Sequence, residues 1–158
     1  LITGGGQEFG LRSGTENVPG IVGFGEAVRI LEAERGKDKK KIAACGDYFW
    51  KKLRAQKMRV RLNGPSFGTK RLPNNLNVYF PGVRAQEFLI KLDRAGIAAS
   101  AGPACSARST KPSSALQEMR LPTPRIQESV RFTLGRGTTK QEIDTVVRII
   151  KDLIIPQP

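Results

Sequence analysis

The apolar residues of this chain recur at helical spacing near both ends and form short extended runs between them. This change of period limits the fold to a few helices combined with a small sheet. Helical spacing begins at about Asn17 and continues through Ile21, Phe24, Val28 and Leu31. Strands are expected at residues 60–62, 75–80, 97–100 and 129–134, and further helices at 85–95 and 113–119 and from residue 139 onward. Pro122 and Pro124 are expected to interrupt the chain between the last two of these helices.

Three local patterns refine this prediction. The charged stretch 32–41 either continues the first helix as a solvated turn or breaks it at Gly36. Cys45 lies on the apolar stripe that resumes after that stretch, which favours a small buried side chain over a reactive thiol. Thr139 and Glu142 have the spacing of a capping box, which predicts the start of the last helix.

We therefore predict an α+β fold with a short, mainly antiparallel sheet and helices packed on one face. The Gly-rich residues 1–16 are expected to form an extended arm, residues 17–155 a small domain and residues 156–158 a tail. The chain starts without Met or a signal-peptide pattern, so we expect it to be part of a longer protein. With no apolar run of about 18 residues, we expect no membrane span.

Composition restricts the chemistry. Two cysteines and no histidine argue against a structural zinc site, and the missing secretory pattern favours free thiols in a reducing cytoplasm. Acid–base chemistry would need a lysine, a carboxylate, a cofactor or another chain. The net charge is +13, and no acidic residue lies between Tyr48 and Gln86. That basic segment would attract nucleic acid or acidic partners, or would be a solvated surface facing an acidic domain outside this chain.

Cys105 is the strongest candidate for a reactive residue. It lies among small residues, between Ala104 and Ser106, and Arg108 and Lys111 follow within six positions. Nearby cations favour the thiolate form of cysteine, which is the nucleophile. On these local grounds a reactive thiol and an incidental one both stay open.

Three ordered segments carry a resemblance to one family. Residues 4–17 resemble the GGGxExGxRSGTxN stretch of the NifS/IscS-type cysteine desulfurases, residues 100–106 resemble their nucleophile loop, and residues 129–136 resemble their substrate-binding strand. The segment 73–78 agrees as well, so the resemblance covers nearly the whole chain.

The resemblance implies the small C-terminal domain of a fold-type-I enzyme that uses pyridoxal 5'-phosphate (PLP) and forms a homodimer. It implies that Cys105 accepts sulfur from L-cysteine as a persulfide and leaves L-alanine, and that Arg131 holds the substrate carboxylate. Thr15 would contact the PLP phosphate of the neighbouring subunit. Sulfur would then pass to an acceptor such as an iron–sulfur scaffold or the enzymes of tRNA thiolation.

The chain also departs from the family. The Schiff-base lysine, the stacking histidine and the carboxylate facing the pyridine nitrogen would lie before Leu1, so we expect this chain alone to be inactive and not to retain PLP. Pro103 stands where the nucleophile loop often has Ser or Ala, and the C-terminal extension that docks a scaffold is short. A basic nucleic-acid-binding module and a cofactor-free persulfide carrier are the alternative functions. A relative acting on selenocysteine or cysteine sulfinate is a further alternative.

Overall fold

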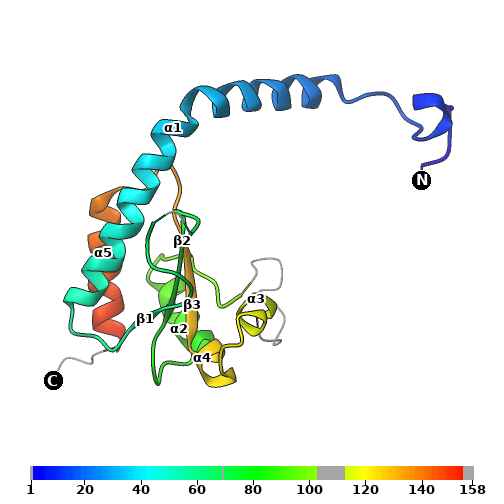
Figure 1. Ribbon diagram of the computed structural model, residues 1–158. Helices are drawn as coiled ribbons and strands as arrows, with labels where there is room; N and C mark the ends of the chain where they lie inside the picture. Colours follow the sequence, from blue (N-terminus) through cyan, green and yellow to red (C-terminus); the bar gives the residue numbers. More distant parts are fainter. Residues whose placement is uncertain (1, 69, 103–112, 155–158) are drawn as a thin grey trace. The chain divides into compact units, whose positions relative to one another are not determined.

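The computed structural model describes residues 2–68, 70–102 and 113–154, and the chain divides into two compact units, Leu1–Lys37 and Asp38–Pro158 (Figure 1). The predicted division into an arm, residues 1–16, and a domain, residues 17–155, stays a prediction. In the first unit, residues before the long helix form one short 3-10 helix, η1 (Glu8–Gly10), and a bridge between Ile2 and Arg12.

Helix α1 (Val18–Ala55) runs from the first unit into the second without a break at Gly36. Its start is capped by Asn17, whose side-chain Oδ1 accepts a hydrogen bond from the Gly20 backbone N–H at 3.1 Å. The residues around Gly36 are mostly Glu, Arg and Lys, which are good helix formers, and they outweigh the cost of about 1 kcal/mol of one helical glycine. Most apolar side chains of the first half are exposed, Phe24 by 74%.

The sheet of the second unit has three antiparallel strands in the order β1 (Arg61–Leu62), β2 (Asn75–Tyr79) and β3 (Ser129–Thr133). This confirms the predicted short antiparallel sheet. The strand predicted at residues 97–100 is wrong in extent, because only Ser100 pairs with β3. Its backbone exchanges hydrogen bonds with Arg131 at 3.1 and 2.6 Å.

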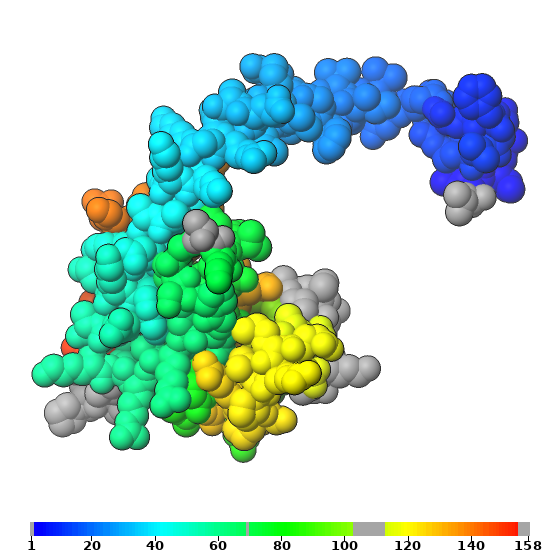
Figure 2. All heavy atoms as spheres, viewed as in Figure 1, coloured from blue at the N-terminus to red at the C-terminus, as the bar shows by residue number. Residues whose placement is uncertain are grey.

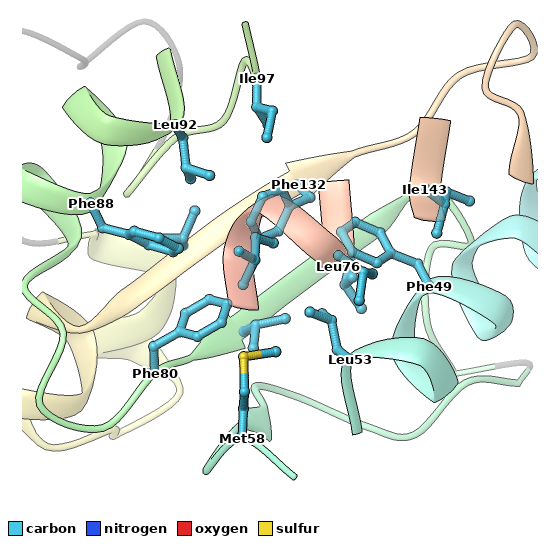
Figure 3. Close-up of a cluster of buried hydrophobic side chains, with 14 of the residues drawn as sticks. Phe49, Leu53, Met58, Leu76, Phe80, Phe88, Leu92, Ile97, Phe132 and Ile143 are labelled. Carbon is cyan, nitrogen blue, oxygen red and sulfur yellow. The ribbon is translucent and has the colours of Figure 1, made fainter. Parts of the chain in front are cut away.

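One face of the sheet forms the core with three helices: the second half of α1, α2 (Ala85–Arg94) and α5 (Lys140–Ile154). Figure 3 shows the aromatic rings that join them, with Phe49 edge-on to Phe132 at 5.3 Å between centroids and Phe80 edge-on to Phe88 at 5.3 Å. Cys45 is 6% exposed in this cluster, which confirms its predicted burial. Strand residues of the core are Leu76, Val78, Val130 and Phe132.

Two short helices, α3 (Ser114–Glu118) and α4 (Thr123–Gln127), lie between α2 and β3 in the chain. The predicted interruption at Pro124 is wrong, because this proline is in the first turn of α4, where its missing N–H has no helical partner to lose. The capping box is confirmed: the Glu142 carboxylate accepts from the Thr139 N–H at 2.7 Å, and the Thr139 hydroxyl accepts from the Glu142 N–H at 3.2 Å.

Candidate active site

The second face of the sheet carries a row of polar residues that crosses all of its strands. Asn77 of β2 pairs with Arg131 of β3, and Arg131 pairs on its other side with Ser100. Asn63, one residue beyond β1, donates its backbone N–H to the Asn77 carbonyl at 2.9 Å and continues the ladder. Side chains alternate between the faces of a strand, so the register that places Leu76 and Val78 in the core places Asn75 and Asn77 on this face.

A cavity of about 300 Å³ lies against this polar face. Arg131, Asn75 and Asn77 contribute from the sheet, while Leu116 and Met119 contribute from α3 and the residue after it. In Figure 2 the yellow atoms of α3 and α4 lie next to green atoms of the first two strands and their connection. The remaining lining residues are Asn63, Gly64, Pro65, Lys70, Arg71, Leu72, Gly102, Ser113 and Ala115.

Two residues that line this cavity each have a polar atom without a hydrogen-bond partner among the described residues. The Nε of Arg131 and the Oδ1 of Asn75 are both buried, and no described residue bonds to either of them. Arg131 is half-buried, and the part of the chain that the structure describes forms no ion pair with its guanidinium. Most buried polar atoms in proteins are paired, so an unpaired Nε on a residue that lines a cavity makes Arg131 a candidate for contact with a ligand or water.

The Asn63 side chain connects the sheet to α4. Its Oδ1 accepts from the Arg125 Nε at 2.7 Å, and its Nδ2 donates to the Asn77 Oδ1 and to the Ser129 Oγ, both at 2.7 Å. Asn63 is 3% exposed and Ser129 is fully buried, so these bonds are shielded from water. The network fixes the side chain of Asn77, which is the cross-strand partner of Arg131.

Arg71 holds the connection between β1 and β2, which forms one wall of the cavity. Its guanidinium donates to the Pro65 carbonyl at 2.7 Å, to the Asn75 carbonyl at 2.9 Å and to the Asn63 carbonyl. Burial lowers the pKa of Arg71 from its usual value. Three carbonyls therefore compensate a partly buried cation that has no carboxylate partner among the described residues.

Of the predicted site residues, Cys105 lies outside the described residues, in the segment 103–112. The described residues that flank this segment are Gly102 and Ser113, and both line the cavity. A Cβ added at Gly102 would lie 3.8 Å from the Ser113 Cβ, so the two flanking residues lie close together. The two described residues on either side of the segment that contains Cys105 therefore lie at the cavity that Arg131 also lines.

Thr15 belongs to the first unit, whereas the residues that line the cavity belong to the second. It is exposed, and it follows a turn in which the Gly14 N–H donates to the Gln7 Oε1 at 3.1 Å and the Gly6 N–H to the Ser13 Oγ at 3.3 Å. The positive φ of Gly14, +105°, needs glycine. The Thr15 hydroxyl makes no hydrogen bond to any described residue, so it is free to bind another molecule.

Part of the basic segment is neutralised within the chain. Lys51 pairs with Asp47 at 2.6 Å and Lys52 with Asp144 at 3.0 Å, while Arg71 is held by carbonyls.

Among the described residues, no group of three metal-ligating side chains occurs. No helix in the described ranges is both long and apolar enough to cross a bilayer.

Sequence reasoning missed Asn63, Asn75, Asn77, Arg71 and Arg125. Two of them, Asn75 and Asn77, lie in the segment 73–78 that agrees with the family, and they alternate with the apolar residues Leu76 and Val78. No sequence pattern indicated Asn63 or Arg125, because their side chains bond to each other over a separation of 62 residues in the sequence.

The comparisons with known proteins agree on one family. The model of the aminotransferase class-V family matches residues 3–146. The cysteine desulfurase IscS of Dictyoglomus turgidum is 38% identical over 154 residues, which cover 98% of this chain and 39% of that protein. A putative cysteine desulfurase IscS 1 of Bacillus subtilis is 38% identical over 155 residues, which cover 98% of this chain and 40% of that protein.

Solved structures give the same result. A NifS-like protein superimposes with a TM-score of 0.81 and 30% identity, over 98% of this chain and 38% of its own. The NifS-like protein of Rickettsia africae gives 0.79 and 29%, over 97% and 39%. This chain thus spans about two fifths of the length of the relatives it matches.

Proposed function

This chain belongs to the aminotransferase class-V family, and from that premise we propose that it is the C-terminal portion of a PLP-dependent cysteine desulfurase. The complete protein would move sulfur from L-cysteine to Cys105 and release L-alanine. One observation carries this proposal: Arg131, whose Nε has no hydrogen-bond partner among the described residues, lines a cavity whose wall includes both residues that flank the segment containing Cys105.

Arg131 would bind the carboxylate of the substrate. A guanidinium is planar and donates two parallel hydrogen bonds to a carboxylate, so it fixes orientation as well as position. A half-buried guanidinium without a protein partner retains this capacity, and its partial burial strengthens a charge-assisted bond by limiting competition from water.

Cys105 would act as the nucleophile. Its thiolate attacks the sulfur of L-cysteine, the bond between that sulfur and the substrate Cβ breaks, and the electron pair passes to the carbon. That carbon takes up a proton to become the methyl group of alanine, and Cys105 is left as a persulfide. Arg108 and Lys111, close to it in sequence, favour the thiolate.

The described residues fit only one part of PLP. The exposed Thr15 hydroxyl and the adjoining turn suit a phosphate contact, and we propose that they serve the site of the neighbouring subunit of a homodimer. When bound, PLP supplies an electron sink for the substrate carbanion. No described lysine is buried, so we propose that the Schiff-base lysine lies in a domain outside this chain, which alone would not retain PLP.

The organisation predicted from the sequence completes the proposal. Residues 1–16 would be the arm that reaches the second subunit, and residues 17–155 the small domain. The free thiol of Cys45 suits a reducing compartment, so we place the enzyme in the cytoplasm. We propose an acidic surface on the sulfur acceptor, such as an iron–sulfur scaffold, because the chain carries a net charge of +13.

The test uses the complete protein that carries this chain. We expect Cys105→Ser to abolish persulfide formation from L-cysteine. We expect Arg131→Ala to lower kcat/KM about thirtyfold to a thousandfold, because a lost charge-assisted carboxylate contact costs about 2–4 kcal/mol. Arg148→Ala, an exposed arginine of α5 outside the cavity, is the matched control and should leave kcat/KM unchanged. A persulfide that still forms in Cys105→Ser would contradict the proposal.

A further inference from the structure

We infer that Asn77 is a second ligand-binding residue beside Arg131, and that Asn63 and Arg125 orient its side-chain amide so that the NH₂ group is left for a carboxylate. This inference rests on the proposed function, because it adds a residue to the same carboxylate site. It follows from the direction of the hydrogen bonds behind the cavity.

The direction of the network is set by Arg125. A guanidinium has donors and no acceptor, so the atom of Asn63 that meets the Arg125 Nε at 2.7 Å must be the carbonyl oxygen. The Nδ2 of Asn63 therefore faces the other way, toward Asn77 and Ser129. This removes the usual ambiguity between oxygen and nitrogen in an asparagine side chain.

Asn63 in turn sets the direction of Asn77. Its Nδ2 is a donor, so Asn77 must accept with Oδ1, and this bond is 2.7 Å long. Ser129 is consistent with this arrangement, since its Oγ accepts from Asn63 and donates to the Arg125 carbonyl at 2.6 Å. The Nδ2 of Asn77 then has no hydrogen bond to any described residue.

The free NH₂ group of Asn77 and the guanidinium of Arg131 are neighbours. The two residues are direct cross-strand partners on the polar face, where Cβ atoms lie about 4.5–5.5 Å apart, and both line the cavity. Two adjacent groups that only donate form a site for an anion with two acceptor oxygens. A small carboxylate, such as that of an amino acid, has this chemistry.

A substitution at residue 63 should reverse the orientation of the Asn77 amide, although the side chain of residue 63 bonds to Asn77 and not to the ligand. In Asn63→Asp the new carboxylate keeps its bond to Arg125 but has no N–H to give to Asn77. The Asn77 amide should then turn over, donate its NH₂ to that carboxylate, and present its oxygen to the ligand. The loss in affinity would come from a residue whose side chain bonds to Asn77 rather than to the ligand.

The experiment measures binding of L-alanine by calorimetry and kinetics with L-cysteine, both in the complete protein. Cysteamine, which lacks the carboxylate, serves as a control competitor. Its binding should not depend on the residues that bind the carboxylate. We expect Asn77→Leu to raise the Kd of L-alanine about tenfold to a hundredfold, Asn77→Asp to raise it further, and Asn63→Asp to raise it about tenfold. Inhibition by cysteamine should be unchanged in all three.

Two comparisons separate positioning from general damage. Asn63→Asp should add less than about twofold in an Asn77→Leu background, because its effect acts through the Asn77 amide. Asn74→Asp, an equal change of charge at a residue that does not line the cavity, should leave L-alanine binding unchanged. If Asn63→Asp does not fold, the two Asn77 variants decide alone.

The outcomes distinguish the two proposals. Unchanged L-alanine binding in Asn77→Leu, together with weakened binding in Arg131→Ala, overturns the role of Asn77 and leaves the proposed function standing. Unchanged binding in both variants overturns the carboxylate site itself. An undiminished effect of Asn63→Asp in the Asn77→Leu background overturns the relay through Asn63.

Discussion

Removing the guanidinium of Arg71 should destabilise the second unit far more than removing the neighbouring charge of Lys70. Arg71 donates to the carbonyls of Pro65, Asn75 and Asn63. Arg71→Met keeps the length and apolar contact of the side chain but leaves these acceptors without a donor. Pro65 is exposed, so water can replace one donor, whereas Asn63 is buried and Asn75 half-buried.

The magnitude follows from those two shielded carbonyls. An acceptor left unpaired in the interior costs about 1–3 kcal/mol, so two of them cost about 2–6 kcal/mol. The variant also removes a cation whose burial is unfavourable, as the lowered pKa of Arg71 indicates. This removal offsets part of the loss in the free energy of unfolding. We therefore expect the free energy of unfolding to fall by about 2–3 kcal/mol, a large share of the about 5–15 kcal/mol of a typical domain.

Urea unfolding followed by the fluorescence of Trp50 measures this difference. Trp50 is the single tryptophan and packs partly buried against the core, so its signal reports on the second unit. With a slope of about 1–3 kcal/mol per molar urea, the midpoint should fall by about 0.7–3 M. Lys70→Met should shift it little, because Lys70 is exposed. Equal shifts in the two variants would refute the claim that Arg71 holds the connection.

Three further predictions concern other parts of the chain. Hydrogen bonds from the Thr139 backbone and hydroxyl hold the pKa of Glu142 below 4.5. The contribution of Glu142 to stability is therefore present above that pH and is lost as the pH falls through the lower pKa of the folded chain. In urea titrations Glu142→Gln should lose less stability on acidification than the unmodified chain. Iodoacetamide should label Cys105 before Cys45 under native conditions, since Cys45 is buried, and peptide mapping that found Cys45 labelled first would contradict this. The 158-residue chain should elute colourless from gel filtration after incubation with PLP and should release no sulfide from L-cysteine; a yellow chain would show that it holds the cofactor alone.

Local patterns predicted the fold well where the responsible interactions are themselves local. The spacing of apolar residues predicted α1 and α2, and the capping box predicted the start of α5 at Lys140. They failed where tertiary context decides. Residues 97–100 have a strand-like composition, yet only Ser100 reaches β3. Pro124 would break a helix in its interior but lies in the first turn of α4, and the sequence does not show which position it occupies.

The site was predictable only in part, for a physical reason. Arg131 was selected by resemblance to a family motif, because the sequence around an arginine on a strand does not show that the residue lines a cavity. Its neighbours are defined by register: Asn77 lies beside it because β2 and β3 pair as they do. The polarity of Asn77 depends on Arg125 through Asn63, over separations of 62 and 14 residues. No window of sequence contains that relation.

The core itself enforces this site. Along β2, Leu76 and Val78 enter the core while Asn75 and Asn77 face the cavity. A single strand register therefore determines the position of both sets of side chains. A slip of one residue would bury Asn77 among apolar side chains and turn Val78 toward the cavity, at a cost of several kcal/mol for each unpaired amide. Packing of β2 against the helices therefore selects the one pairing in which Asn77 stands beside Arg131. Substitutions that loosen the core at Leu76 should disturb carboxylate binding even though they touch no polar residue.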